Sequence, residues 1–211
     1  MTMEAAATRV HVQRPLAPED SGRADFYALL ARVFHAPPDS SLLASLAAAA
    51  DLAEDADPAL ARAWGELAAA SSVVDADAAQ WEYETLFVGV GPSEITPYAA
   101  FYAGASAVDH PRVRLRADLA GLGLARREHA AETEDHFAAL FDAMRVLVAG
   151  GAGRSAAPVE EQKRFYQAHV APAVGKFLRA LKSSQNANYY RKVAALGEAF
   201  FAIESESFTR T

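Results

Sequence analysis

The sequence contains no cysteine among its 211 residues. This absence excludes a disulfide framework and any thiolate metal site, and it fits a reducing compartment, with the cytoplasm as the expected location. Basic residues are also scarce, because 20 lysines and arginines stand against 27 aspartates and glutamates, a net charge of −7. Such a surface disfavours nucleic acid and anionic lipid as partners and favours a basic peptide.

The sequence also lacks strand-like alternation and long apolar runs. No window alternates apolar and polar residues for long enough to predict a strand. Residues 1–17 carry Arg9, His11 and Arg14 among small residues, without the continuous apolar segment of a secretory signal or a membrane span. We therefore expect no stable membrane insertion, and we interpret residues 1–20 as a flexible N-terminal tail.

Apolar residues instead recur at helical spacing between proline and glycine breaks. We expect helices at 21–34 after a Ser21 cap, from Asp39 or Ser40, from Pro58, from Asp75 to Val88, from Pro111, over 129–148, over 160–168, from Pro172, and from Asn188 onward. This pattern predicts a compact all-α bundle of roughly 8–10 helices. Residues 21–208 would form one all-helical domain, or two closely packed lobes with a boundary near 103–111.

The stretch from Trp81 to Tyr102 is the densest in aromatic residues and turn signals. A helix is expected to end at Gly89, Gly91 and Pro92, because glycine adopts left-handed conformations and proline cannot continue the helical ladder. We interpret these three residues as a structural loop. They do not form a phosphate-binding loop, since the preceding strand and the Lys-Ser/Thr pair are missing.

Histidines and carboxylates on the expected 129–148 helix could suggest a metal or acid-base site. His129 and His136 are seven residues apart, however, which is not the i, i+4 spacing of a zinc helix. The neighbours in Asp135-His136 and in Asp109-His110 would point about 100° apart on a helix. We therefore expect no catalytic residue, metal or cofactor. The acidic stripe of this helix is either a solvated face or attracts an arginine-bearing segment lying in an adjoining apolar groove; it comprises Glu128, Glu132, Asp135 and Asp142.

Two ordered motifs resemble a known family. The first is Glu82-Tyr83-x-x-Leu86-Phe87-x-Gly89-x-Gly91-Pro92, followed by Pro97-Tyr98 and Tyr102. The second is Glu134-Asp135-His136-Phe137 at the start of an apolar helix. Together they resemble the signatures of the TorD/DmsD/NarJ group of redox-enzyme maturation chaperones, and the similarity extends over about residues 23–208. The chain departs from that pattern at Val90, Leu140 and Ala143.

The resemblance implies a cytoplasmic, all-helical chaperone for a molybdopterin-dependent oxidoreductase. Such a protein binds the twin-arginine leader or the apo form of the catalytic subunit and assists cofactor insertion before assembly or export. Formate dehydrogenase, a dimethyl-sulfoxide-type or trimethylamine-oxide-type reductase and nitrate reductase are all open as clients. The resemblance allows a monomer or a domain-swapped dimer, with a hinge expected at 104–107.

We predict that the client peptide contacts one set of residues in and near the two motifs: Glu82, Tyr83, Phe87, Glu94, Pro97, Tyr98, Tyr102, Asp135 and His136. The aromatic members would pack against apolar client residues, and Glu82, Glu94 and Asp135 would meet client arginines. A helical scaffold or regulator of unrelated type, or a small metal-dependent hydrolase, is the alternative function.

Overall fold

The computed structural model describes residues 16–53, 56–89, 93–104, 111–125, 132–151 and 154–210. Within these ranges every regular element is helical, which confirms the predicted all-α class. The elements in chain order are α1 (Pro18–His35), α2 (Ser40–Ala48), η1 (Ala50–Ala53), α3 (Pro58–Ser71), α4 (Ala76–Tyr83), η2 (Glu84–Val88), α5 (Ala99–Ala103), α6 (Pro111–Gly121), α7 (Phe137–Ala149), α8 (Val159–Phe165), η3 (Tyr166–Val170), α9 (Ala171–Ser183) and α10 (Tyr189–Arg210). The turns η2 and η3 are π-helical.

Three helix starts follow from local capping chemistry. The side chains of Asp39, Asp57 and Asp75 accept hydrogen bonds from the first-turn N–H groups of α2, α3 and α4. An aspartate at this position satisfies amide donors that have no partner inside the helix. The first helix differs from the prediction, since it begins at Pro18 and not after a Ser21 cap. Proline is well suited to a first helical turn because it lacks the N–H that would be unsatisfied there.

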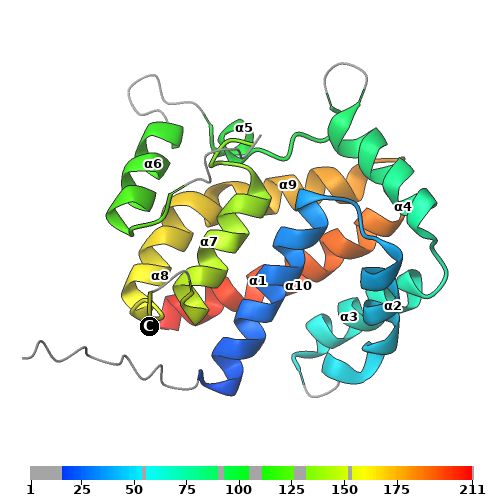
Figure 1. Ribbon diagram of the computed structural model, residues 1–211, viewed down its shortest axis with the longest axis horizontal. Helices are drawn as coiled ribbons and strands as arrows, with labels where there is room; N and C mark the ends of the chain where they lie inside the picture. Colours follow the sequence, from blue (N-terminus) through cyan, green and yellow to red (C-terminus); the bar gives the residue numbers. More distant parts are fainter. Residues whose placement is uncertain are drawn as a thin grey trace, which may run out of the picture.

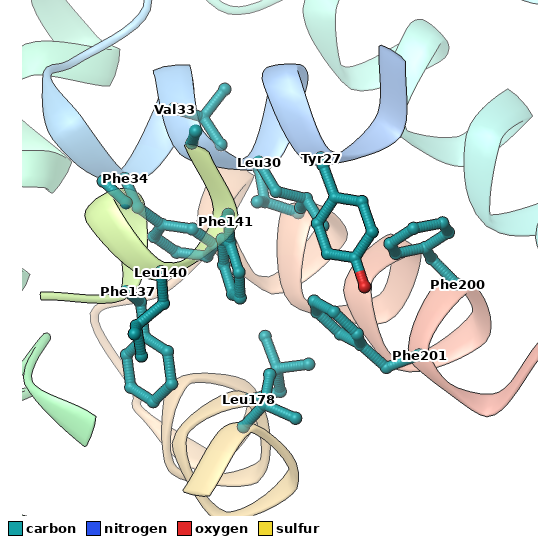
Figure 2. Packing of buried hydrophobic residues seen from close by; sticks show 14 of the residues in the cluster. Tyr27, Leu30, Val33, Phe34, Phe137, Leu140, Phe141, Leu178, Phe200 and Phe201 are labelled. Carbon is teal, nitrogen blue, oxygen red and sulfur yellow. The ribbon is translucent and has the colours of Figure 1, made fainter. Parts of the chain in front are cut away.

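The core lies where α1 and α7 run side by side through the centre of the molecule, with α6 at one edge and α2 to α4 at the other (Figure 1). Tyr27 and Phe34 of α1, and Phe137 and Phe141 of α7, are at most 1 % exposed. Figure 2 shows these rings converging with Phe200 and other apolar residues. Aromatic packing of this density makes α1 and α7 a rigid pair.

The long helix predicted over residues 129–148 is wrong in its first part. Residues 132–136 form a turn, and α7 begins only at Phe137. The Phe137 N–H donates to the carbonyl of Pro97 at 2.9 Å, and the Ala99 N–H donates to the carbonyl of Asp135 at 2.8 Å. These bonds to a distant segment replace helical bonds, so the continuous acidic stripe expected on one helix does not form.

The C-terminal third of the chain is helical almost without interruption. The helices expected over 160–168 and from Pro172 form one run, α8–η3–α9, in which η3 inserts a wider turn just before the proline. The polar break before α10 is present, as predicted. Among the described helices, none is both long enough and apolar enough to cross a bilayer.

Candidate functional site

Glu82 is buried in the structure, with 6 % of its surface exposed. Its carboxylate accepts hydrogen bonds from the N–H groups of Asn188, Tyr189 and Tyr190 at 2.8, 3.0 and 2.8 Å. These are the first amides of α10, where a negative charge is also favoured by the helix dipole. Glu82 therefore caps α10, a role expected of Asn188, and its carboxylate does not face solvent where an arginine of a client could reach it.

The aromatic residues of the first motif divide between core and surface. Phe87 is 8 % exposed and packs against Phe34 and Tyr190, with ring centroids 6.0 and 5.1 Å apart. Tyr83 is half-buried, and its hydroxyl donates to the carbonyl of His35 at 3.0 Å. Trp81 is instead 64 % exposed. Phe87 thus stabilises the core, whereas Tyr83 connects the end of α4 to the C-terminal end of α1.

The predicted structural loop is described only at its start. Gly89 has a φ of 62° and ends η2, and its N–H donates to the carbonyl of Glu84. A positive φ favours glycine, because a Cβ would be strained in that conformation. Gly91 and Pro92 lie outside the described residues.

The two motifs meet at one place in the fold. Tyr98 and His136 form an isolated antiparallel bridge, and their rings lie edge to face with centroids 5.2 Å apart. The buried Pro97 takes part through its carbonyl, which accepts the first N–H of α7. Segments separated in the sequence therefore build one surface, and the order of the motifs along the chain could not show this.

Asp135 and His136 are each 4 % exposed and both hold local structure. The Asp135 carboxylate accepts the Thr133 hydroxyl at 2.6 Å, while His136 Nδ1 accepts the N–H of Ala138 at 3.1 Å and caps α7. Burial lowers the pKa of His136 below its usual value, against the opposing effect of Glu132. The neutral imidazole is the form that this cap requires, since a protonated Nδ1 cannot accept a hydrogen bond.

Tyr98 donates its hydroxyl to Glu132. Burial, followed by this hydrogen bond and the charge of Glu132, raises the pKa of Tyr98 to about 12. The phenol is therefore a permanent donor at physiological pH. Tyr98 thus lies behind His136, which lines the end of a surface groove.

Glu94 and Tyr102 lie away from this point. The Glu94 carboxylate accepts bonds from Ser184 Oγ and Asn186 Nδ2 at 2.5 and 2.7 Å, and these two bonds lower its pKa. Tyr102 packs against Phe137 and Phe177. Of the carboxylates predicted to meet client arginines, Glu94 alone has an exposed side chain.

One hollow of the described surface is a groove between α1 and α7, which we call the α1–α7 groove. Its volume is about 460 Å³, within the range of ligand sites. Small residues form much of its floor, Ala28 and Ala31 on α1 and Ala138 and Ala143 on α7. Leu119 and Leu124, in α6 and just after it, form the opposite side. The groove is thus lined mainly by apolar atoms, with small side chains where a peptide could approach closely.

Charged residues lie along the rim of the α1–α7 groove. Glu132 and Glu134 come from the turn before α7, Asp142 and Arg145 from α7 itself, and Arg32 and His35 from α1. Asp142 pairs with Arg145 at 2.7 Å, and Arg32 pairs with Asp39 at 2.9 Å. The two glutamates lie at the end of the groove where the motifs meet, where Glu132 accepts the Tyr98 hydroxyl and Glu134 pairs with Arg116 at 3.1 Å.

Of the nine residues predicted to contact a client, only His136 lines this groove. Tyr98, Pro97 and Asp135 support it from behind through the contacts given above. Glu132 and Asp142 belong to the acidic stripe for which an adjoining groove was expected, and both do lie on its rim. The α1 residues were missed. The sequence did offer one signal, the alanines spaced three residues apart on α1 and five residues apart on α7. Such spacing indicates that two helices approach closely only once they are known to pair.

The metal alternative finds no cluster of ligands in the described part of the chain. Among those residues, no group of three or more His, Asp or Glu side chains is placed to hold a metal ion. His129, Asp109 and His110 lie outside the described residues. His169, which follows the aromatic pair of α8 and η3, instead contacts Asp118 on α6 with 2.6 Å between Nε2 and Oδ2.

The fold and the groove define an all-helical protein with a peptide-sized apolar groove. Residues 53–179 match the nitrate reductase delta subunit family, and since this is more than half of its length, the chain belongs to that family. Its members are maturation chaperones of redox enzymes and not catalysts. The predicted family resemblance and the absence of enzymatic function are confirmed.

A solved structure supports the fold. The crystal structure of a redox enzyme maturation protein from Archaeoglobus fulgidus is similar with a TM-score of 0.53 and 19% identity, covering 93% of this chain and 99% of that one. At this identity the likeness concerns the fold alone. No curated protein matches the chain.

Proposed function

We propose that this protein binds, in the cytoplasm, the leader segment or the apo form of the catalytic subunit of a molybdopterin-dependent oxidoreductase, and that the α1–α7 groove is the binding site. Held there, the client would remain open to cofactor insertion before assembly or export. Membership of a family of redox-enzyme maturation chaperones supports the class of partner. The observation that carries the site is the groove itself, which lies where the two family motifs meet.

The groove suits an amphipathic segment with an arginine near one end. Apolar client side chains would lie over Ala138, Ala143 and Leu124, and small floor residues leave room for them. A client guanidinium would add to the hydrogen bonds already made by Glu132 and Glu134 at the rim. Burial of the apolar side chains would supply most of the affinity, and the carboxylates would chiefly speed association.

This proposal replaces two of the predicted contacts. Glu82 and Asp135 are buried and hydrogen-bonded within the chaperone, so the rim glutamates are better placed for arginine. Phe87 contributes to the core and so to the shape of the site, not to its surface. His136 remains as a predicted residue that lines the groove, and Tyr98 supports it from behind.

Calorimetry with synthetic leader peptides of molybdopterin-dependent oxidoreductases from the same organism tests the proposal. Ala139, an exposed groove residue on α7, is changed to tryptophan to fill the groove, and Ala69, exposed on α3, is changed in the same way as the control. We expect Ala139→Trp to weaken binding by about tenfold or more, because it occupies the space of a client side chain. Equal binding by both variants would place the site elsewhere, and absence of binding by the unmodified protein to every peptide and every apo subunit would refute the function.

A further inference from the structure

Helix α6 is attached to the rest of the protein by very little buried surface. Leu115 is the one buried residue of α6, with 2 % of its surface exposed, whereas Val113 is 65 % exposed. By contrast, α7 buries most of its residues, among them Phe137, Phe141 and Met144 at 0 %. Since segments with few buried apolar contacts open at low free energy, α6 is the described helix of this region most able to move.

Open space borders α6 on two sides. The α1–α7 groove lies against Leu119 on one side. On the other side, two hollows lie between α6 and the α8–η3 segment. The first has a volume of about 460 Å³ and is bordered by Arg114 and Gln167. The second has a volume of about 390 Å³ and is bordered by Gly121 and Phe165. Protein interiors are otherwise close-packed, so a helix between hollows can shift without displacing packed side chains.

Polar contacts hold α6 in its position. Asp118 bonds to His169 of η3, with 2.6 Å between Oδ2 and Nε2, and Arg116 bonds to Glu134 at 3.1 Å. Arg154 also donates to the carbonyl of Leu122, just beyond the helix. Arg116 and Asp118 are exposed, so they can exchange these contacts for water at modest cost, unlike a packed core, whereas their partners Glu134 and His169 are largely covered. One of these contacts ends on Glu134, at the rim of the groove.

We propose that α6 is a movable wall of the α1–α7 groove, held closed by the Asp118–His169 and Arg116–Glu134 contacts, and that it moves outward, away from both η3 and α7, to admit a client segment when these contacts break. The identity of the occupant rests on the proposed function, whereas the motion does not. A client arginine that bonds to Glu134 competes with Arg116 and therefore favours the open position.

Amide hydrogen exchange of the full-length protein tests the motion. We expect the amides of α6 to exchange at least about tenfold faster than those of α7. Asp118→Asn should accelerate exchange in α6 by roughly five- to tenfold more, because it replaces a charge-assisted hydrogen bond with a weaker neutral one. Glu198→Gln is the matched control, because it removes the exposed Lys182–Glu198 pair elsewhere. Exchange in α6 as slow as in α7, and unchanged by Asp118→Asn, would overturn the proposal.

The absence of cysteine allows a second test. The double variant Asp118→Cys and His169→Cys is compared before and after its two thiols are joined by a short bis-maleimide. Each single-cysteine variant, treated with the same reagent, serves as a control. The probe is the dye 8-anilinonaphthalene-1-sulfonate, which binds exposed hydrophobic surface. We expect linking to reduce dye binding several-fold, and Asp118→Asn to raise it unless Ala139→Trp fills the groove. Dye binding that is indifferent to linking would refute a movable wall.

The same linked protein separates the two proposals. If linking abolishes leader-peptide binding, both stand. If the peptide binds linked and unlinked protein equally, the groove remains the site and the movable wall is refuted. If α6 exchanges rapidly while no peptide or apo subunit binds, the motion stands and the proposed function fails.

Discussion

At the scale of single residues, Glu82 joins two segments that are 106 residues apart. One carboxylate satisfies three backbone amides, at a helix end that would otherwise leave them buried without partners. Because α10 packs along α3, α9 and the core, the position of Glu82 also determines where the first motif lies relative to the C-terminal helix.

Removing this cap should destabilise the protein. We expect Glu82→Ala to lower the free energy of unfolding by about 1–3 kcal/mol, because buried amides lose a charged acceptor. Urea denaturation followed by circular dichroism measures the change. Glu84→Ala, which removes an exposed carboxylate bonded only to Gln80 among the contacts described, should change the value by less than about 0.5 kcal/mol. Similar losses in both variants would contradict the cap.

His136 predicts a pH dependence. Its folded pKa lies below the ordinary value of 6.5 because of burial, as does that of His169, so the unfolded chain binds protons more readily. The stability contributed by the neutral imidazoles is therefore complete above pH 6.5 and is lost as the pH falls through the lower folded pKa values. Denaturant titrations between neutral and mildly acidic pH should show this decline.

A substitution separates the two histidines. Asparagine can accept the Ala138 N–H as His136 does but does not titrate. We expect His136→Asn to retain most of the stability at neutral pH and to show a shallower decline on acidification, with the part due to His169 remaining. An unchanged pH profile would assign the decline to other groups.

At the scale of helices, the pairing of α1 with α10 depends on a buried ionic cluster. Glu204 is 1 % exposed and accepts bonds from Arg23 at 2.6 Å and from the Tyr27 hydroxyl at 2.8 Å. Burial lowers the pKa of Arg23, but the bond to Glu204 and its charge outweigh this effect, so the pKa is raised overall. The guanidinium also lies over the ring of Phe208. This cluster determines how the two helices align.

Breaking the cluster should be costly. We expect Glu204→Ala to lower the free energy of unfolding by about 3–5 kcal/mol, since it leaves Arg23 partly buried without its main partner. Glu206→Ala, two residues on and exposed, removes only the surface pair with Arg210 and should cost less than about 1 kcal/mol. Thermal and urea unfolding of the two variants decide between these values.

At the scale of the whole molecule, the net charge of −7 combines with the acidic end of the α1–α7 groove. A negative surface attracts a basic segment over distances of about 8–10 Å at physiological ionic strength, and salt screens this attraction. Charge therefore acts mostly on the rate of encounter, while the apolar floor acts on the lifetime of a complex.

Salt should accordingly change association more than dissociation. For an arginine-bearing leader peptide that binds, we expect the association rate to fall by roughly tenfold between about 10 mM and 300 mM salt, with dissociation changed by less than about twofold. Stopped-flow fluorescence measures both rates. Glu132→Gln with Glu134→Gln should reduce the salt dependence, and an apolar peptide without arginine serves as the control. A salt effect confined to dissociation would contradict this account.

The helices themselves were predictable because their signals are local. Asp39, Asp57 and Asp75 cap helices through atoms only two or three residues away, and the apolar spacing of Leu60, Trp64 and Leu67 is enough to identify a buried face. The two motifs were also visible, and with them the family. None of these features depends on which segment of the chain lies opposite.

The site could be predicted only in part, for the opposite reason. Periodicity extended the helix to residue 129, whereas the backbone pairing of Pro97 and Ala99 with residues 135–137 starts α7 at Phe137. From the sequence alone, Glu82 was predicted to be a charge that a client could reach. Only the fold shows that the start of α10 lies beside it and donates to its carboxylate. His136 lines the proposed groove, but it precedes the helix on which it was expected and caps that helix.

The sequence by itself determined the helical class, most helix boundaries, the acidic charge and the family, because each follows from composition or from contacts a few residues apart. Only the tertiary structure decided which charged residues are buried, where the α1–α7 groove opens and how α6 borders it. Those features arise from the packing of segments up to 181 residues apart, as between Arg23 and Glu204, and no local pattern encodes such distances.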